Sequence, residues 1–110
     1  MPRVGFRNVA EFLTGKQKRF LRGLGHGLKP TVVVGKQGIG ATLLRHLEES
    51  FEAHELVKVK VLQTAPLGPS ESGEEIVAAT GAVVAQALGR TLLLYRPHPE
   101  NPDLKLPASE

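Results

Sequence analysis

Residues 31–62, TVVVGKQGIGATLLRHLEESFEAHELVKVKVL, decide the fold of this chain. The β-branched run at 31–34 has no polar alternation, which predicts a strand covered on both faces, as in parallel sheets. Residues 41–53 repeat their leucines and phenylalanine with a helical period, and residues 56–62 alternate valine with lysine as a half-covered strand does. The stretch therefore predicts a strand, a glycine loop, a helix and a second strand joined by a right-handed crossover.

The flanking sequence adds one helix before this unit and three elements after it. Thr14 and Gln17 have the spacing of a capping box, which predicts a helix over 15–26 that Pro30 separates from the first strand. A third helix should begin between Pro69 and Gly73, with Ser72 and Glu75 as its capping box. It should end at Thr80 with Gly81 as its left-handed cap. Strands at 82–88 and 91–96 should then meet at a tight turn, Gly89-Arg90. The predicted fold class is a single α/β domain in the order α-β-α-β-α-β-β.

On a helical wheel the first helix has an apolar face for the core and a cationic face for solvent. The apolar face holds Phe20, Leu21, Leu24 and Leu28, and the cationic face holds Lys18, Arg19 and Arg22. In the second helix Leu43, Leu44, Leu47 and Phe51 form the apolar face, and His54 falls within that face near the helix end. There a hydrogen-bonded or charged histidine next to the last carbonyls is the simplest interpretation.

Composition and charge exclude several classes of protein. The chain has 110 residues and no cysteine, so it is long enough for one core and has neither disulfides nor a thiolate metal site. It lacks an apolar run of transmembrane length or a signal-peptide core, so the expected location is the cytoplasm, without membrane contact. The first 46 residues carry nine Lys and Arg against one acidic residue, a net charge of +8, whereas the other 64 carry −5. That asymmetry indicates a polyanionic partner, with nucleic acid favoured over membrane.

The glycine loop Gly35-Lys36-Gln37-Gly38 is the strongest candidate for chemistry. Glycines between a strand and a helix let backbone amides approach an anion, and the helix N-terminus and Lys36 add positive charge. The loop lacks the hydroxyl residue that a P-loop places after its lysine, and its glycines do not have the spacing of a dinucleotide fingerprint. The pattern that remains is G-x-x-G, the backbone clamp of KH-type nucleic-acid domains.

The sequence contains no recognisable catalytic or metal-binding motif. The four histidines have no helical spacing that completes a metal cluster, and no cofactor is expected. A phosphate-dependent enzyme would need a magnesium carboxylate near Lys36, and no convincing one is present, so the chain is not expected to be an enzyme. An alternative function is a protein-interaction module that docks a basic ribosomal protein on the acidic face of the second helix: Glu48, Glu49 and Glu52.

Aromatic residues are few, and Phe20 and Phe51 are assigned to the core, whereas Tyr95 could be core or rim. Base stacking should therefore be scarce, which favours contact with phosphates and with the shape of structured RNA.

Five separated blocks resemble a known family in the right order. They are 13–22 (LTGKQKRFLR), 28–30 (LKP), 35–38 (GKQG), 54–60 (HELVKVK) and 89–97 (GRTLLLYRP). These blocks are similar to the CRM domain, named for chloroplast RNA splicing and ribosome maturation, whose stand-alone bacterial members are YhbY-like proteins. The resemblance covers residues 13–107, and the proline- and glycine-rich 66–73 departs from it. It implies a four-stranded mixed sheet like the C-terminal domain of bacterial translation initiation factor three. It also implies an RNA-binding protein of large-subunit ribosome precursors.

The resemblance places RNA contact on the glycine loop and the basic first helix. The predicted RNA-binding residues, which include one further lysine of the basic half, are Lys16, Lys18, Arg19, Arg22, Lys29, Gly35, Lys36, Gln37 and Gly38. Residues 1–12, with Arg3 and Arg7, would be a basic N-terminal arm and 13–97 the RNA-binding domain. Residues 98–110 would be a proline-rich tail, in which 104–106 could dock as an edge strand. A monomer is expected.

Overall fold

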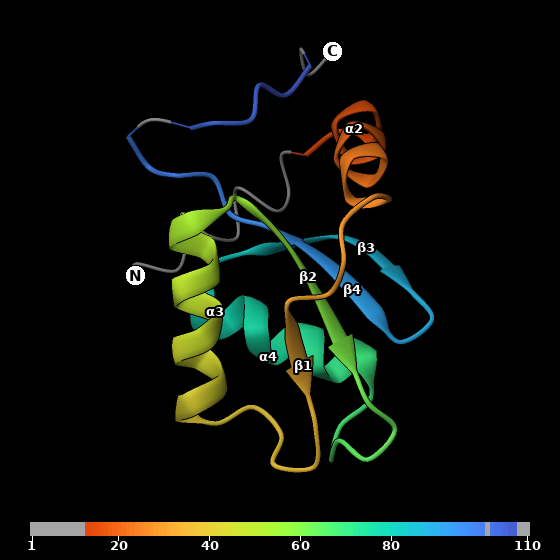
Figure 1. Ribbon diagram of the computed structural model, residues 1–110. Helices are drawn as coiled ribbons and strands as arrows, with labels where there is room; N and C mark the ends of the chain where they lie inside the picture. Colours follow the sequence, from red (N-terminus) through yellow and green to blue (C-terminus); the bar gives the residue numbers. More distant parts are fainter. Residues whose placement is uncertain (1–12, 101, 108–110) are drawn as a thin grey trace.

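A computed structural model describes residues 13–100 and 102–107, and its elements follow the predicted order (Figure 1). The predicted N-terminal arm lies outside the described residues. The helices and strands are α2 (Gly15–Gly25), β1 (Val32–Val34), α3 (Ala41–Ala53), β2 (Leu56–Val61), α4 (Pro69–Thr80), β3 (Val83–Leu88) and β4 (Thr91–Tyr95). The α/β class and the order of the elements predicted from the sequence are thus confirmed.

The four strands form one mixed sheet in the order β1-β2-β4-β3. β1 pairs with β2 in parallel, as the strand-helix-strand unit predicts, and β4 pairs antiparallel with both β2 and β3. Val33 lies opposite Lys60 in the first pair, and Lys58 lies opposite Leu93 in the second. Because paired residues point to the same side of a sheet, these four side chains share one face.

The two faces of the sheet are covered unequally. Helices α3 and α4 cover one face, where Leu47, Phe51 and Ile76 pack on the valines of β2 in the larger buried cluster. On the other face α2 covers one end, where Leu21 packs with Leu93 in a smaller cluster. The rest of that face is open: Val33, in the middle of β1, is 49% exposed. The prediction that β1 is covered on both faces is therefore wrong, because α2 does not extend over this outer strand.

α2 packs on the sheet through a different side from the one that its apolar residues predict. Its buried residues are Leu21 and Gly25, whereas Phe20 is 37% and Leu24 42% exposed, and Leu28 beyond the helix is 39% exposed. The reason is a close approach at Gly25, where a Cβ atom would lie 2.6 Å from both methyl carbons of Leu93. The helix sits on the sheet along the line through Leu21 and Gly25. Assigning Phe20 to the core is therefore wrong.

Most helix ends match the sequence signals. Thr14 and Gln17 form both hydrogen bonds of the predicted capping box, at 3.0 and 3.1 Å. α4 ends at Thr80 with Gly81 (φ 79°) as its left-handed cap, as predicted, and it starts at Pro69, within the predicted range, but its N-terminal capping residues differ. Glu71 accepts the backbone N–H of Gly68, whereas Ser72 is buried inside the helix and its hydroxyl donates to a carbonyl of the preceding turn. The predicted capping box at Ser72 is wrong because Pro69, suited to a first helical position, begins the helix four residues before Gly73, where that box would start it.

A buried carboxylate fastens the segment that follows β4. Glu55 accepts backbone N–H groups from His98, Asp103 and Leu104 at 2.6, 3.0 and 2.7 Å. Burial raises the pKa of Glu55, but these backbone hydrogen bonds outweigh burial and hold the pKa below its ordinary value. Residues 104–106 do not form the edge strand that the sequence suggested. They have no regular secondary structure, and Leu104 and Leu106 pack against the smaller buried cluster, which contains Leu21 and Leu93.

Histidine placement at the end of α3 also differs from the prediction. His54 is exposed and extended, one residue past the helix. The ring that lies near the last carbonyls belongs to His98, whose Nε2 is 3.0 Å from the carbonyl oxygen of Phe51. The helical wheel placed His54 on the apolar face because it continued the helix by one residue too many.

Candidate nucleic-acid interface

The glycine loop is a tight turn that presents its two central side chains to solvent. The N–H of Gly38 donates to the carbonyl of Gly35 at 3.0 Å, so Lys36 and Gln37 occupy the corner of the turn and are exposed. Gly38 has a φ of 72°, and a Cβ there would lie 3.1 Å from a ring carbon of Pro66. Glycine is required at this position, because an L side chain would be strained in that conformation and crowded by the proline.

The loop opens onto the N-terminus of α3. A hollow of about 570 Å³ is lined by the loop and by the first turns of the helix, including Lys36, Ala41, Thr42 and His46. Gly40 precedes the helix and provides no side-chain cap. The N–H groups of the first turn therefore remain available to an acceptor, and they point along the positive end of the helix dipole. Lys36 and these amides together form a site suited to a phosphate.

The predicted cations of α2 lie on two flanks of the helix. Lys16 and Arg19 are exposed on the flank away from the sheet, whereas Lys18 and Arg22 are half-buried. Arg22 lines a hollow of about 350 Å³ between α2 and the open sheet face, together with His26 and Lys58. Lys58 donates from Nζ to the carbonyl of Leu28 at 3.1 Å. This hollow brings α2 and β2 together as one cationic region.

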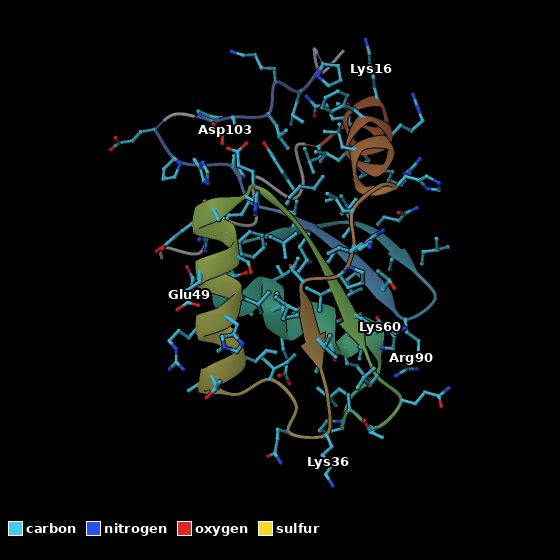
Figure 2. The ribbon with its side chains drawn as sticks, in the orientation of Figure 1. Lys16, Lys36, Glu49, Lys60, Arg90 and Asp103 are labelled. Atoms are coloured by element: carbon cyan, nitrogen blue, oxygen red, sulfur yellow. The ribbon has the colours of Figure 1, made fainter. Side chains whose placement is uncertain are left out.

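Lys16 and Lys36 lie at opposite ends of the molecule, and the open sheet face connects them. Figure 2 shows Lys60 and Arg90 between these two lysines. Lys60 is exposed, and the guanidinium of Arg90 donates to the carbonyls of Val61 and Leu62. The predicted set of site residues omits Lys58, Lys60 and Arg90, although the valine-lysine alternation of β2 already placed both lysines on its solvent side. Lys29, which the prediction included, is exposed in the connection from α2 to β1.

Few carboxylates of the described residues pair with cations. In the described part of the chain, ion pairs with Asp or Glu involve only Arg96 and His98. Within residues 13–100 and 102–107, no carboxylate forms an ion pair with Lys16, Lys18, Arg19, Arg22, Lys29 or Lys36. Unpaired cations along one side of a domain attract a polyanion, and the attraction depends strongly on salt concentration.

The acidic face of α3 is partly occupied within the molecule. Both guanidinium nitrogens of Arg96 donate to the Glu48 carboxylate at 3.0 Å, and the guanidinium carbon lies 4.8 Å above the ring of Phe51. Glu49 and Glu52 remain exposed. Tyr95, which the sequence left as core or rim, is buried at 3% exposure. Arg96 thus joins β4 to α3.

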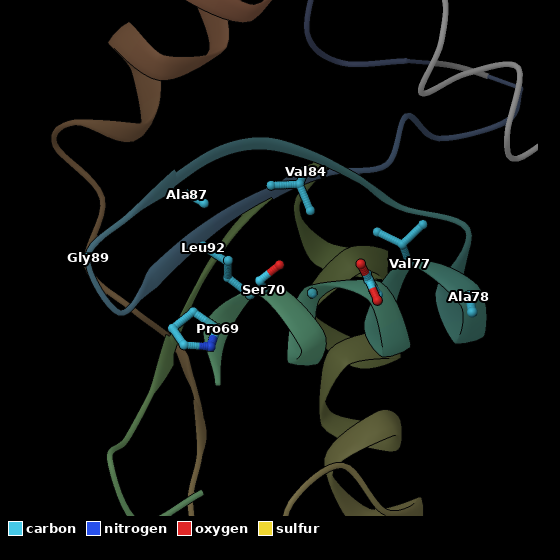
Figure 3. Close-up of a pocket in the computed structure, with 10 residues that line it drawn as sticks. Pro69, Ser70, Val77, Ala78, Val84, Ala87, Gly89 and Leu92 are labelled. Carbon is cyan, nitrogen blue, oxygen red and sulfur yellow. The ribbon is translucent and has the colours of Figure 1, made fainter. Parts of the chain in front are cut away.

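A further groove lies on the other side of the sheet. A groove of about 880 Å³ separates α4 from β3 and β4 and is lined mainly by apolar side chains such as Val77, Val84 and Leu92 (Figure 3). Its charged lining residue is Glu74, which would repel a phosphate. No helix among residues 13–100 and 102–107 is long and apolar enough to cross a membrane.

Comparison with known proteins identifies the family. Residues 13–96 match the model of the CRS1 / YhbY (CRM) domain, so this chain belongs to that family. "Probable RNA-binding protein YqeI" of Bacillus subtilis is 40% identical over 86% of this chain and 99% of its own length. "RNA-binding protein" of Haemophilus influenzae is 40% identical over 80% of this chain and 89% of its own length.

A solved structure confirms the fold. The solution structure of SAV1595 from Staphylococcus aureus, described as a candidate RNA-binding protein, superposes with a TM-score of 0.72 at 38% identity. The match covers 86% of this chain and 99% of that one. The family and the names of these relatives indicate RNA-binding proteins and not enzymes, as predicted from the sequence.

Proposed function

We propose that this protein binds structured RNA of large ribosomal subunit precursors and assists their assembly. The observation that carries the proposal is a series of cations that runs from α2 across the open sheet face to the glycine loop and that has no carboxylate partner among the described residues. The names of the relatives support an RNA partner, and the family resemblance supports the ribosomal target.

In this proposal each region has a different task. Gly35 and Gly38 shape the turn, Lys36 and the first amides of α3 bind a phosphate, and Gln37 lies beside them at the corner of the turn. The cations of α2, with Lys29, Lys58 and Lys60, follow the same RNA along the sheet face. Because phosphate contacts carry no base information, this surface recognises RNA by its backbone and shape.

The test is a fluorescence-anisotropy titration of large-subunit ribosomal RNA fragments between about 50 and 200 mM salt. A surface that contacts six phosphates should lose about 10³-fold in affinity over that range. Lys36→Glu should weaken binding about equally for all RNA sequences and flatten the salt slope by about one unit. Arg45→Glu is the matched control, because it makes the same charge change at an exposed residue on α3 outside the proposed site.

Two results would contradict the proposal. One is equal binding by the Lys36→Glu and Arg45→Glu variants, because Lys36 would then contribute only net charge. The other is an effect of Lys36→Glu that depends strongly on RNA sequence, because a phosphate contact cannot produce it. Small-subunit fragments titrated in parallel test the ribosomal target, and a preference for large-subunit fragments is expected.

A further inference from the structure

Phe20 is an exposed aromatic residue on a cationic helix. Its side chain is 37% exposed, whereas Phe51 is fully buried and Tyr95 is 3% exposed. Among the residues that the structure describes, Phe20 is therefore the aromatic ring that a ligand can reach. The sequence had suggested scarce base stacking because Phe20 was assigned to the core, and the packing of α2 removes that reason.

The helix surface around Phe20 includes two cations and a glycine, besides Gln17 and Leu24. Lys16 lies one turn before Phe20 and Gly23 about one turn after it, since residues three or four apart share a helix face. Arg19 is exposed on the same flank. A Cβ on Gly23 would meet nothing within 4 Å, so the helix surface at Gly23 is open. Gly23 also lines the hollow that holds Arg22 and Lys58.

We propose that Phe20 stacks on an unpaired base of the bound RNA, while Lys16 and Arg19 contact the phosphates beside that base. An aromatic ring stacks on any base because every base has a π-face, and flanking cations attract the adjoining backbone. The proposal rests on the proposed function and adds a preference to it. The protein should favour structured RNA that has an unpaired nucleotide beside a helix.

The charge around Phe20 favours RNA over an apolar protein surface as its partner. α2 has no acidic residue in its sequence, GKQKRFLRGLG, and its cations lack carboxylate partners within the described residues. Leu24 lies one turn after Phe20 and is 42% exposed, so it would share in docking to an apolar protein. It has no π-system on which a base could stack. Leu24 is therefore the control that separates the two kinds of partner.

The experiment compares two RNAs that differ in one nucleotide. One is a fully paired duplex of large-subunit ribosomal sequence, and the other is the same duplex with a single bulged 2-aminopurine, whose fluorescence falls on stacking. Phe20→Leu keeps the apolar character and removes the π-face. It should leave duplex affinity unchanged and lower affinity for the bulged RNA by about 5- to 150-fold. Phe20→Trp should retain both affinity and fluorescence quenching, and Leu24→Ala should behave as wild type.

The outcomes separate this inference from the proposed function. If wild type binds both RNAs with steep salt dependence and Phe20→Leu has no effect on the bulged RNA, the stacking inference fails and the proposed function stands. Equal losses on both RNAs in Phe20→Leu and Leu24→Ala would also overturn stacking, because a loss that does not depend on the unpaired base cannot come from stacking on it. If wild type binds neither RNA, both proposals fail.

Discussion

Replacing Gly25 by alanine tests the packing of α2, on which the exposure of Phe20 depends. The added Cβ would lie 2.6 Å from two Leu93 methyl carbons and 3.1 Å from its Cγ, and Leu93 is 1% exposed within a packed cluster. Overpacking of this kind costs about 1–3 kcal/mol. Alanine recovers at most about 1 kcal/mol of helix propensity, and less here because α2 ends at Gly25. The expected net loss is about 1–2 kcal/mol.

The assay is thermal unfolding of Gly25→Ala beside Gly23→Ala. Gly23 lies on the same helix with nothing near its absent Cβ, so alanine there should stabilise by up to about 1 kcal/mol. At about 4–8 °C per kcal/mol for a small domain, the two melting temperatures should move in opposite directions. If Gly25→Ala stabilised the protein as much as Gly23→Ala, α2 could not pack through Gly25. In that case Phe20 would not be accessible to a ligand.

Two further predictions concern the core and the C-terminal segment. Leu47→Ala should cost about 2–5 kcal/mol, because Leu47 is fully buried on the inner face of α3; an unchanged urea midpoint would refute that packing. Glu55→Gln should destabilise the protein at pH 7 by about 1.5–3 kcal/mol, because the charged acceptor of three backbone N–H groups is lost. A carboxyl group whose pKa is depressed by folding stabilises above its unfolded pKa of about 4.3, and this contribution is lost as the pH falls through the folded value. Denaturant titrations below pH 5 should therefore show a steeper loss for wild type than for Glu55→Gln, and parallel curves would contradict the role of Glu55.

The order of elements was predictable because local signals specify it. The capping residues Thr14 and Gln17, the left-handed Gly81 and the period-2 alternation of β2 act within a few residues, and the structure confirms each of them. The covering of each face was not predictable in the same way. Whether β1 is covered on one face or two depends on how far α2 extends over the sheet, which no pattern within β1 encodes.

The error at Phe20 has a related cause. A helical wheel sums hydrophobicity and therefore predicts the side with the most apolar area as the inner side. Gly25 contributes almost nothing to such a sum, yet its missing side chain lets the helix approach Leu93 closely. The side of α2 that faces the sheet is thus set by the close fit of Gly25 against Leu93. The apolar side chains of Phe20, Leu24 and Leu28 remain at the surface. The role of Glu55 was not predictable either, because the backbone N–H groups that donate to its carboxylate lie more than forty residues later in the sequence.

The distribution of charge between the two faces has a consequence for how the domain meets a polyanion. Lys58 and Lys60 lie on the open face with α2, whereas the exposed glutamates of α3 and α4 belong to the helices that cover the opposite face. A modest net charge of +3 therefore hides a large charge separation across the sheet. Such a separation orients a molecule during diffusion, because the field of the polyanion attracts one face and repels the other. In the proposed binding mode, the acidic half of the sequence thus favours the productive orientation without contacting the ligand. Neutralising Glu49 and Glu52 should therefore raise the rate of non-productive encounters and leave the dissociation rate of the bound complex unchanged.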